Sequence, residues 1–581
     1  MNKLKFIICI FLGISFFSCN EEEWLTEKPL GFKAPEYSYE TAAQFKQAVN
    51  YMYEMVRFWH FRYSDETGGW QHHLYIGSDV FYHGWPNNID DNLNRYNVWI
   101  IPTRNHVDRN WEHFYNVIAN ANTILSMLET NASQVTPAAK LTFRGEALFF
   151  RAYYYSRLAH IWGGVPLVTE MLTAPRYDFV RATRDEVYTQ CQKDLEEAVT
   201  LLADIDKVVD GAVSKQLAQH LLAEVYISRG LATGSNDYYN KAIEAANAVV
   251  TYSKLGLMKQ RFGPYKDDAT KDVFYDLFRL GNQNRKSGNT EGLWVLQYDY
   301  QNGSPYVCNR ARYIMPQLRT ARTAGIPGKS GVAPDGTTLA CPDFTVDDGG
   351  RGNGYFPTTY HFRKRIWGAD FDTDIRNSKF NIFRDYKIDN VNAVGHGKYI
   401  IADGFLNTPD TFNFIYPAVT KFCGFEAIPA AGYTMSGGVR ATTSTGKFLV
   451  QNASDFAIGS FTDEYLIRLS ETYLLLAEAY VRAGQKDKAA DAINVVRDRA
   501  NATLATADEM DIDYILDERI RELCGEEVRN ITLFRMGKFV ERAKKYSPCG
   551  KYVGDHQNLW PIPFAEIEKN IKAKLEQNPG Y

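Results

Sequence analysis

Two stretches of the chain repeat their apolar residues at helical spacing. In residues 107–253 and 462–546, apolar side chains recur three and four positions apart, as they do along the buried face of an amphipathic helix. Residues 254–461 differ, because Gly, Pro, Asp, Asn and aromatic residues interrupt any long periodic run. Such a composition favours loops and short strands. The pattern therefore predicts a mostly α-helical chain whose two helical parts flank a loop-rich region.

A short motif recurs in the two helical stretches. Ala223–Tyr226 (AEVY) is followed by Gly230, and Ala477–Tyr480 (AEAY) is followed by Gly484 at the same spacing. Small residues let two helices approach closely, and we expect each glycine to end the first helix of a hairpin and each tyrosine to lie in the core. An ordinary pair of alanine-rich amphipathic helices is the alternative. We predict a tetratricopeptide-like helical-hairpin scaffold with the irregular ligand-binding region inserted between repeats.

Further hairpins are indicated earlier in the chain. Pro137 is typical of a helix start, and Gly163 and Gly164 are typical of a helix stop. On this basis we expect two more helix pairs, which are residues 111–128 with 138–161 and residues 184–203 with 214–229.

The start of the chain has the layout of a signal peptide. A positively charged beginning precedes the apolar run Phe6–Phe17, and Ser18 stands directly before Cys19. The run is shorter than the roughly 20 residues that a spanning helix needs. The end of this layout resembles a lipobox, where cysteine receives a lipid. We predict a signal peptide over residues 1–18, lipidation of Cys19 and one mature unit over residues 19–581; cleavage without lipidation is the alternative.

Charge and cysteine spacing exclude several protein classes. The net charge of −4 gives no basic patch for nucleic acid. After the N-terminal run, no apolar stretch is long enough to span a membrane. Of eight cysteines, Cys9 and Cys19 belong to the N-terminal segment, and none of the others forms a CxxC pair or a Cys/His cluster. A structural zinc site is therefore not expected, and the spacing leaves any disulfide pairing open.

One charged cluster has the residue types of a catalytic site. Residues 518–529 are dense in Glu and Arg, and paired carboxylates are found in glycosidases. Their three- and four-residue spacing is also that of ion pairs along a helix, which we prefer as the interpretation. The chain has no Gly-x-Ser-x-Gly, P-loop or His-Glu-x-x-His motif. We therefore predict a protein that is not an enzyme and that has no catalytic residue, cofactor or metal.

Aromatic residues in polar loops are the best candidates for binding. A sugar presents an apolar C–H face and a rim of hydroxyl groups, so an aromatic ring beside Asn or Asp suits it. The loop Ser78–Trp99 places Tyr82 and Trp85 beside Asn87 and Asn88. We predict that these four residues bind ligand, with local packing as the alternative for the aromatics.

Two other loops contribute one candidate each. Tyr300 follows the alternating sequence Trp294–Tyr298, which resembles one face of a strand, and lies nearer the expected turn. Trp367 lies in the segment Tyr360–Asp374, among several arginines. We add Tyr300 and Trp367 to the predicted ligand-binding residues.

Several sequence blocks together resemble the SusD/RagB family of outer-membrane nutrient-binding lipoproteins. The resemblance spans the chain, and it rests on the shared order of the blocks rather than on any one of them. In order they are Glu23–Pro29 (EWLTEKP), Trp111–Leu125 (WEHFYNVIANANTIL), Gly145–Pro166 (GEALFFRAYYYSRLAHIWGGVP), Arg181–Leu195, Arg468–Arg499, Asp517–Gly537 (DERIRELCGEEVRNITLFRMG) and Leu559–Tyr581, which ends in QNPGY.

This resemblance implies a function. A SusD-like protein would be lipid-anchored in the outer membrane at the cell surface, and the acidic run 20–23 resembles a surface-export signal. It would capture an oligosaccharide or polysaccharide ligand and deliver it to a SusC-like TonB-dependent transporter. In such proteins the loop at the position of Trp85 often contributes Trp and Asn to the glycan site. The alternatives are a RagB-like peptide-binding uptake lipoprotein, a surface glycosidase and a repeat scaffold that binds only protein.

Overall fold

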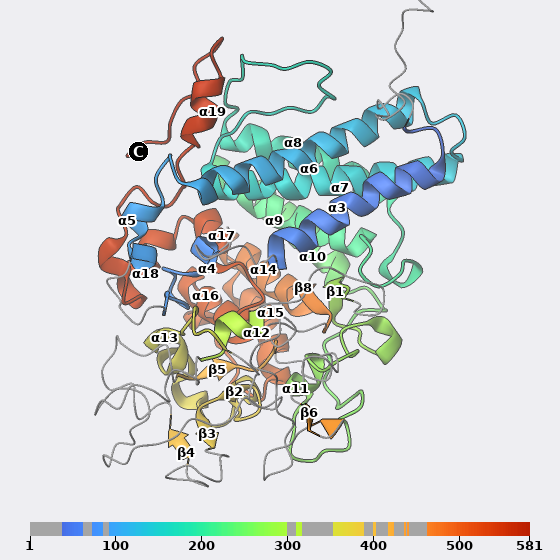
Figure 1. The fold of residues 1–581 in the computed structure, drawn as a ribbon. Coiled ribbons are helices and arrows are strands. Elements are labelled where there is room, and N and C mark those ends of the chain that lie inside the picture. Colours follow the sequence, from blue (N-terminus) through green and yellow to red (C-terminus); the bar gives the residue numbers. More distant parts are fainter. Residues whose placement is uncertain are drawn as a thin grey trace, which may run out of the picture.

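The computed structural model confirms a mostly α-helical fold. Long helices cross the upper part of the molecule in Figure 1, and short strands of the loop-rich region lie at the bottom. The structure describes ten stretches of the chain, and the statements below concern these: residues 38–61, 72–84, 92–298, 310–316, 352–387, 399–401, 416–422, 435–436, 439–440 and 462–581.

The helices fall into two sets. The helical scaffold, by which we mean α6–α10 and α14–α18, comprises α6 (Asn105–Thr130), α7 (Pro137–Trp162), α8 (Arg184–Leu201), α9 (Lys215–Thr233), α10 (Asn236–Val250), α14 (Leu469–Arg482), α15 (Lys486–Arg499), α16 (Ile512–Leu523), α17 (Arg529–Met536) and α18 (Phe539–Tyr546). The others are α3 (Ala42–Phe61), α4 (His72–Tyr75), α5 (Tyr96–Trp99), α11 (Val273–Leu277), α12 (Arg310–Ile314), α13 (Tyr360–Arg363) and α19 (Phe564–Lys569).

Strands occur only as short antiparallel pairs in the described part of the chain. β1 (Gly292–Leu296) pairs with β8 (Glu464–Arg468), so it joins residues 254–461, here called the inserted region, to the strand that precedes α14. The other pairs are β2 (Ile382–Phe383) with β5 (Ala418–Val419), β3 (Asp385–Lys387) with β4 (Tyr399–Ile401), and β6 (Met435–Ser436) with β7 (Val439–Arg440).

The predicted hairpins are present, and local signals set their ends. α6 packs on α7, α8 on α9, α9 on α10 and α14 on α15. Thr136 caps α7, Pro137 is its first residue and Gly163 follows its last, while Thr183 opens α8 with a reciprocal capping box to Glu186. These groups satisfy backbone donors that a helix start leaves unpaired. α10 also packs on α14, so the inserted region leaves and re-enters the chain between neighbouring hairpins.

The two glycines of the repeated motif have different roles, which corrects our expectation. Gly484 follows α14 with a φ of 76°, as predicted for a helix stop. Gly230 instead lies inside α9, which continues to Thr233 and ends at Gly234. A Cβ at Gly230 would lie 2.3 Å from Cε1 of Tyr239 on α10. The glycine is therefore needed for close packing of α9 on α10, not for ending the helix.

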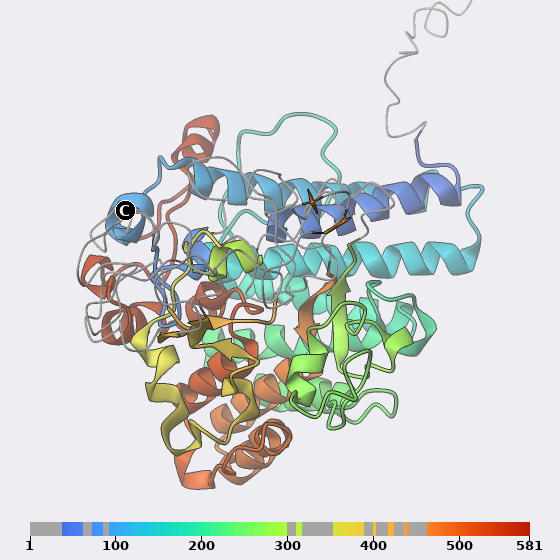
Figure 2. The ribbon, with the colours of Figure 1, turned by 60° about the horizontal axis from the view of Figure 1, so that its bottom comes forward.

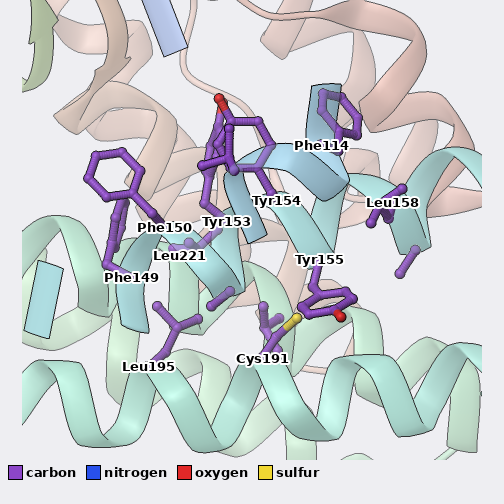
Figure 3. Packing of buried hydrophobic residues seen from close by; sticks show 14 of the residues in the cluster. Phe114, Phe149, Phe150, Tyr153, Tyr154, Tyr155, Leu158, Cys191, Leu195 and Leu221 are labelled. Atoms are coloured by element: carbon purple, nitrogen blue, oxygen red, sulfur yellow. The ribbon is translucent and has the colours of Figure 1, made fainter. Parts of the chain in front are cut away.

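The main apolar core surrounds α7. This helix contacts α6 on one side and α8 on another, and nearly all its side chains from Phe143 to Trp162 are buried. Figure 3 shows Phe149 and Phe150 pointing to one side of α7 and Tyr155 lying beside Cys191 of α8. The hydroxyl of Tyr155 donates to the backbone oxygen of Val168 at 2.8 Å. Aromatic side chains thus fill this core, and the polar end of Tyr155 finds a backbone partner within it.

The inserted region has a smaller apolar cluster and lies against the C-terminal helices. Phe356, Ile366 and Trp367 pack there with Ile520 of α16. In Figure 2 the yellow part of the inserted region lies beside the orange C-terminal helices. None of the helices within the described stretches has both the length and the hydropathy needed to cross a membrane. Cys191 and Cys524 are buried free thiols, and Cys549 is buried beside Asn94.

Candidate functional site

Three distant segments meet where the predicted ligand loop begins. The backbone N–H of Tyr82 donates to the oxygen of Pro357 at 3.2 Å, and that of Gly84 donates to the oxygen of Tyr355 at 3.1 Å. The N–H of Phe356 in turn donates to the oxygen of Tyr313 at 2.9 Å. Residues 72–84, 310–316 and 352–360 therefore form one connected unit. The loop that contains Trp85 starts directly from it.

Aromatic rings from all three segments stack at this junction. We call this set the aromatic platform; it consists of His72, His83, Tyr313, Tyr355 and Phe356. Tyr313 and Tyr355 stack with ring centroids 5.6 Å apart and planes at 20°, and His83 lies 5.6 Å from Tyr355. His72 meets Tyr313 edge-on at 4.8 Å. Tyr355 is half-buried and the others are buried, so Tyr355 is the ring of the platform that reaches solvent.

His72 and His73 have lowered pKa values, and their rings point apart. Burial, and then the neighbouring His83 and His106, lower the pKa of His72 to about 3. His72 packs on Tyr313, whereas the next ring, His73, stacks on His106 with centroids 4.3 Å apart. Side chains at adjacent positions of a helix point in different directions, so these two rings do not face one site. Within the described residues, no group of three or more His, Cys, Asp or Glu side chains is arranged to hold a metal ion.

A buried charge fastens the platform to the helical scaffold. Arg529 of α17 donates two hydrogen bonds to the carboxylate of Asp79, at 2.9 and 2.7 Å, and Arg542 of α18 binds the same carboxylate. Burial alone would raise the pKa of Asp79, but the two guanidinium groups lower it well below its usual range. Asn530 donates to two backbone oxygens in and just after α4, at 2.9 Å each. The platform is thus fixed to α17 and α18.

One side chain closes the stem of the predicted ligand loop. The N–H of His83 donates to the side-chain oxygen of Asn94 at 2.7 Å, and the amide nitrogen of Asn94 donates to the backbone oxygen of His83 at 2.8 Å. Asn94 is buried. These two hydrogen bonds hold His83, before the loop, against Asn94, after it. They act like the paired backbone hydrogen bonds between two antiparallel strands.

The charged cluster at residues 518–529 forms a buried ion-pair network. Burial would raise the pKa of Glu522, but Arg499, Arg468 and Arg376 lower it well below its usual range. Within the cluster only the pair of Glu518 with Arg521 follows the predicted spacing. Arg519 and Arg529 pair with Glu527 at other spacings, and the arginines that pair with Glu522 come from distant segments. A general acid needs a raised pKa and access to substrate, and these carboxylates are ionised and enclosed by guanidinium groups.

The predicted ligand residues fall into two groups. Tyr82 and Trp367 are buried, with 3% and 2% of their surfaces exposed. The indole nitrogen of Trp367 donates to the backbone oxygen of Phe362 at 2.7 Å, and its ring belongs to the apolar cluster of the inserted region. Contact with ligand stays a prediction for both, and the structure gives them a packing role. The remaining predicted residues lie outside the described stretches: Cys19, Trp85, Asn87, Asn88 and Tyr300.

Sequence reasoning missed Tyr313 and Tyr355. Tyr355 lies in the stretch Gly352-Asn353-Gly354-Tyr355, an aromatic residue inside a turn-forming segment, which is the same signal that selected Trp85. Tyr313 has no such signal, because only the fold brings α12 against residues 352–357.

Two family profiles together cover most of the chain. One, described as "Starch-binding associating with outer membrane", matches residues 34–227, and that of the SusD family matches residues 290–581. Among curated relatives, SusD-like protein P25 of Formosa agariphila is 22% identical over 625 residues, covering 100% of both chains. Starch-binding protein SusD of Bacteroides thetaiotaomicron is 24% identical over 470 residues, covering 77% of this chain and 74% of SusD.

Solved structures show the same fold at low sequence identity. A laminarin-binding SusD-like protein is 21% identical with a TM-score of 0.62, covering 94% of this chain and 100% of its own. A SusD homologue from Bacteroides thetaiotaomicron is 18% identical with a TM-score of 0.65, covering 94% of this chain and 98% of its own. With the SusD profile matching half of the residues and the helical architecture agreeing, the chain belongs to the SusD/RagB family.

Proposed function

We propose that this protein is a lipid-anchored glycan-binding protein of the cell surface, which captures oligosaccharides and delivers them to a SusC-like TonB-dependent transporter. Membership of the SusD/RagB family supports this proposal. Two relatives are named for binding starch and laminarin, which favours carbohydrate as the ligand class here.

The observation that carries the proposal is the partly exposed ring of Tyr355. It is supported from below by Tyr313 and lies at the start of the loop that contains Trp85. A supported aromatic ring offers a flat apolar face at little entropic cost, which suits the C–H face of a sugar. Asn87, Asn88 and Tyr300 remain the predicted polar and aromatic surroundings of this face.

Substitution of Tyr355 tests the proposal. In affinity electrophoresis against a panel of polysaccharides, Tyr355→Ala should weaken retention on the preferred glycan about tenfold, or roughly 1.4 kcal/mol, because the stacking face is lost. Tyr360→Ala is the matched control: Tyr360 is 49% exposed, and Arg365 rather than the platform lies over its ring. Equal retention of both variants would remove Tyr355 from the site.

The same gels separate the alternative functions. Retarded migration without release of reducing sugar supports glycan binding alone, whereas released oligosaccharide products would contradict it and point to a glycosidase. Binding to peptides but to no glycan in the panel would favour the RagB-like role.

Lipidation is tested separately at Cys19. Cell fractionation of a Cys19→Ala variant should find the protein in the soluble fraction, because its attachment would depend on the acyl chains. Retention of that variant in the outer membrane would contradict a lipid anchor.

A further inference from the structure

A cavity lies in the helical scaffold, away from the aromatic platform. It has a volume of about 450 Å³ and is formed by α3, α7, the end of α8 and the connection between α8 and α9. Its walls are mainly aliphatic, and Val209 at 77% exposure marks its open side. The aliphatic walls include Leu201, Val208, Val209, Ala212 and Val213. This size is in the range of small-molecule pockets.

A buried glutamate lines this cavity with one unsatisfied oxygen. Glu146 of α7 is 5% exposed. Its Oε1 accepts a hydrogen bond from the hydroxyl of Tyr53 at 2.7 Å, and that hydroxyl accepts one from the N–H of Val213 at 2.9 Å. The second oxygen, Oε2, has no hydrogen-bond partner among the described residues. A buried acceptor without a donor costs free energy, so a donor that enters the cavity would be stabilised there.

Glu146 is an exception among the buried carboxylates. Every other buried Asp or Glu within the described residues forms an ion pair with an arginine, and Glu146 forms none. Burial raises its pKa, which Lys46 and the Tyr53 hydrogen bond counteract. Lys46 is exposed and lines the same cavity. Among the described residues, the carboxylate thus lacks the arginine ion pair that its buried counterparts have, and the exposed Lys46 is the nearby cation.

We propose that this cavity binds an organic cation, an alkylammonium or alkylguanidinium group whose head pairs with Glu146 and whose stem lies along the aliphatic walls. Such stems are apolar and pack well against Leu and Val. A sugar fits less well, because among the described residues that line the cavity only Phe143 is aromatic and it is buried. One carboxylate also offers too few oxygens for a hard metal ion. The cation can be a free amine or a Lys or Arg side chain of another protein.

Two isosteric probes test the charge requirement. n-Butylammonium and n-butanol share an apolar body, and only the first carries a charge. In saturation-transfer NMR titrations of the mature full-length protein at neutral pH, n-butylammonium should bind at least tenfold more tightly than n-butanol. Equal affinities would overturn the proposal, since the cavity would then recognise the apolar body alone.

Glu146→Gln is the decisive variant, because glutamine keeps the shape and an acceptor for Tyr53. It should lose at least tenfold in affinity for n-butylammonium and keep its affinity for n-butanol. Glu196→Gln is the matched control: Glu196 also accepts a tyrosine hydroxyl, that of Tyr226 at 2.6 Å, but it is exposed on α8. Unchanged n-butylammonium binding by Glu146→Gln would overturn the proposal.

A surface variant provides an independent test of the cation site if Glu146→Gln folds poorly. Lys46→Ala removes a like charge from the cavity, so it should strengthen n-butylammonium binding about twofold and leave n-butanol binding unchanged. Weaker n-butylammonium binding would contradict the proposed position of the cation.

The source of the cation is distinguished by a short peptide. An acetylated, amidated Gly-Lys-Gly peptide carries the same butylammonium group on a polypeptide. Displacement of n-butylammonium by this peptide would indicate a partner's side chain, and its exclusion while n-butylammonium binds would indicate a free amine. Failure of both to bind would overturn the proposal.

Discussion

The helical scaffold and the inserted region are held by different forces. Inside the scaffold, α7 is surrounded by aromatic and aliphatic side chains from α6, α8 and α17. Where the inserted region meets α15 and α16, buried ion pairs cross the contact beside the smaller apolar cluster. Arg376 binds Glu518 at 2.7 Å, and Lys421 binds Glu526 at 2.6 Å. We call this set of buried ion pairs the seam. It also contains Asp370 with Arg497, and Glu291 with Arg468 and Arg499.

The difference follows from the geometry that each force requires. Apolar packing is nearly non-directional and tolerates volume-conserving change. A buried guanidinium must meet its carboxylates at fixed distances and angles, and a broken pair leaves a charge without compensation. We infer that the seam determines how the inserted region is oriented on the scaffold, while the apolar core supplies most of the stability of the scaffold.

Removing the central carboxylate of the seam should have the largest effect. Glu522→Ala leaves Arg376, Arg468 and Arg499 without their shared partner. We expect the free energy of unfolding to fall by about 3–5 kcal/mol, measured by urea denaturation. The control is Glu541→Ala, because Glu541 is 51% exposed and pairs with Lys538 on the surface, where about 0.5 kcal/mol is expected. Similar losses in both variants would contradict a special role for the seam.

Acid should weaken the seam. Burial would raise the pKa of Glu518, but Arg376, Arg521 and Arg497 lower it to about 2 from an ordinary 4.5. Because the folded pKa lies below the unfolded one, the stabilisation is complete above about pH 4.5 and is lost as the pH falls toward 2. The stabilisation that ionised Glu518 contributes above that pH amounts to about 3 kcal/mol.

Urea denaturation at pH 5 and pH 3 should therefore show a smaller loss of stability for Glu518→Gln than for the unmodified protein. An identical acid dependence of the two proteins would mean that Glu518 does not contribute. Hydrogen exchange should show the earliest acid-induced opening in residues 352–384, next to the seam.

Overpacking in the scaffold should have the smallest effect of the three. Gly230→Ala places a methyl group against the ring of Tyr239, which should cost about 1–3 kcal/mol. The thermal midpoint measures this loss. Combining it with Tyr239→Ala removes the clash, so the double variant should lose less than the sum of the single losses. Additive losses would show that the contact is not the cause.

The scaffold could be predicted because its signals are local. The apolar period of α6–α10, the start at Pro137 and the stop at Gly163 act within a few residues, and each gave the correct element. Gly230 was interpreted wrongly because the residue that explains it, Tyr239, lies on the next helix. The arginines that pair with Glu522 were unpredictable for the same reason, since they come from other segments.

Residues of the candidate site were harder to identify. Trp367 has the same sequence signal as an exposed loop aromatic, yet it is buried in the smaller cluster. The sequence does not distinguish a buried aromatic ring from an exposed one, because exposure depends on which distant residues pack over the ring. Tyr313 became a candidate only through its stack on Tyr355.

The sequence by itself determined the helix class, the repeated hairpins and the resemblance to the SusD/RagB family, because periodicity, caps and ordered motifs are properties of neighbouring residues. The tertiary structure alone decided which aromatics form the platform, which charges pair across the seam and which carboxylate remains without a cation. Those outcomes depend on contacts between residues hundreds of positions apart, such as Asp79 with Arg529. Local sequence patterns do not indicate which distant residues come into contact, and only the packed chain brings these groups together.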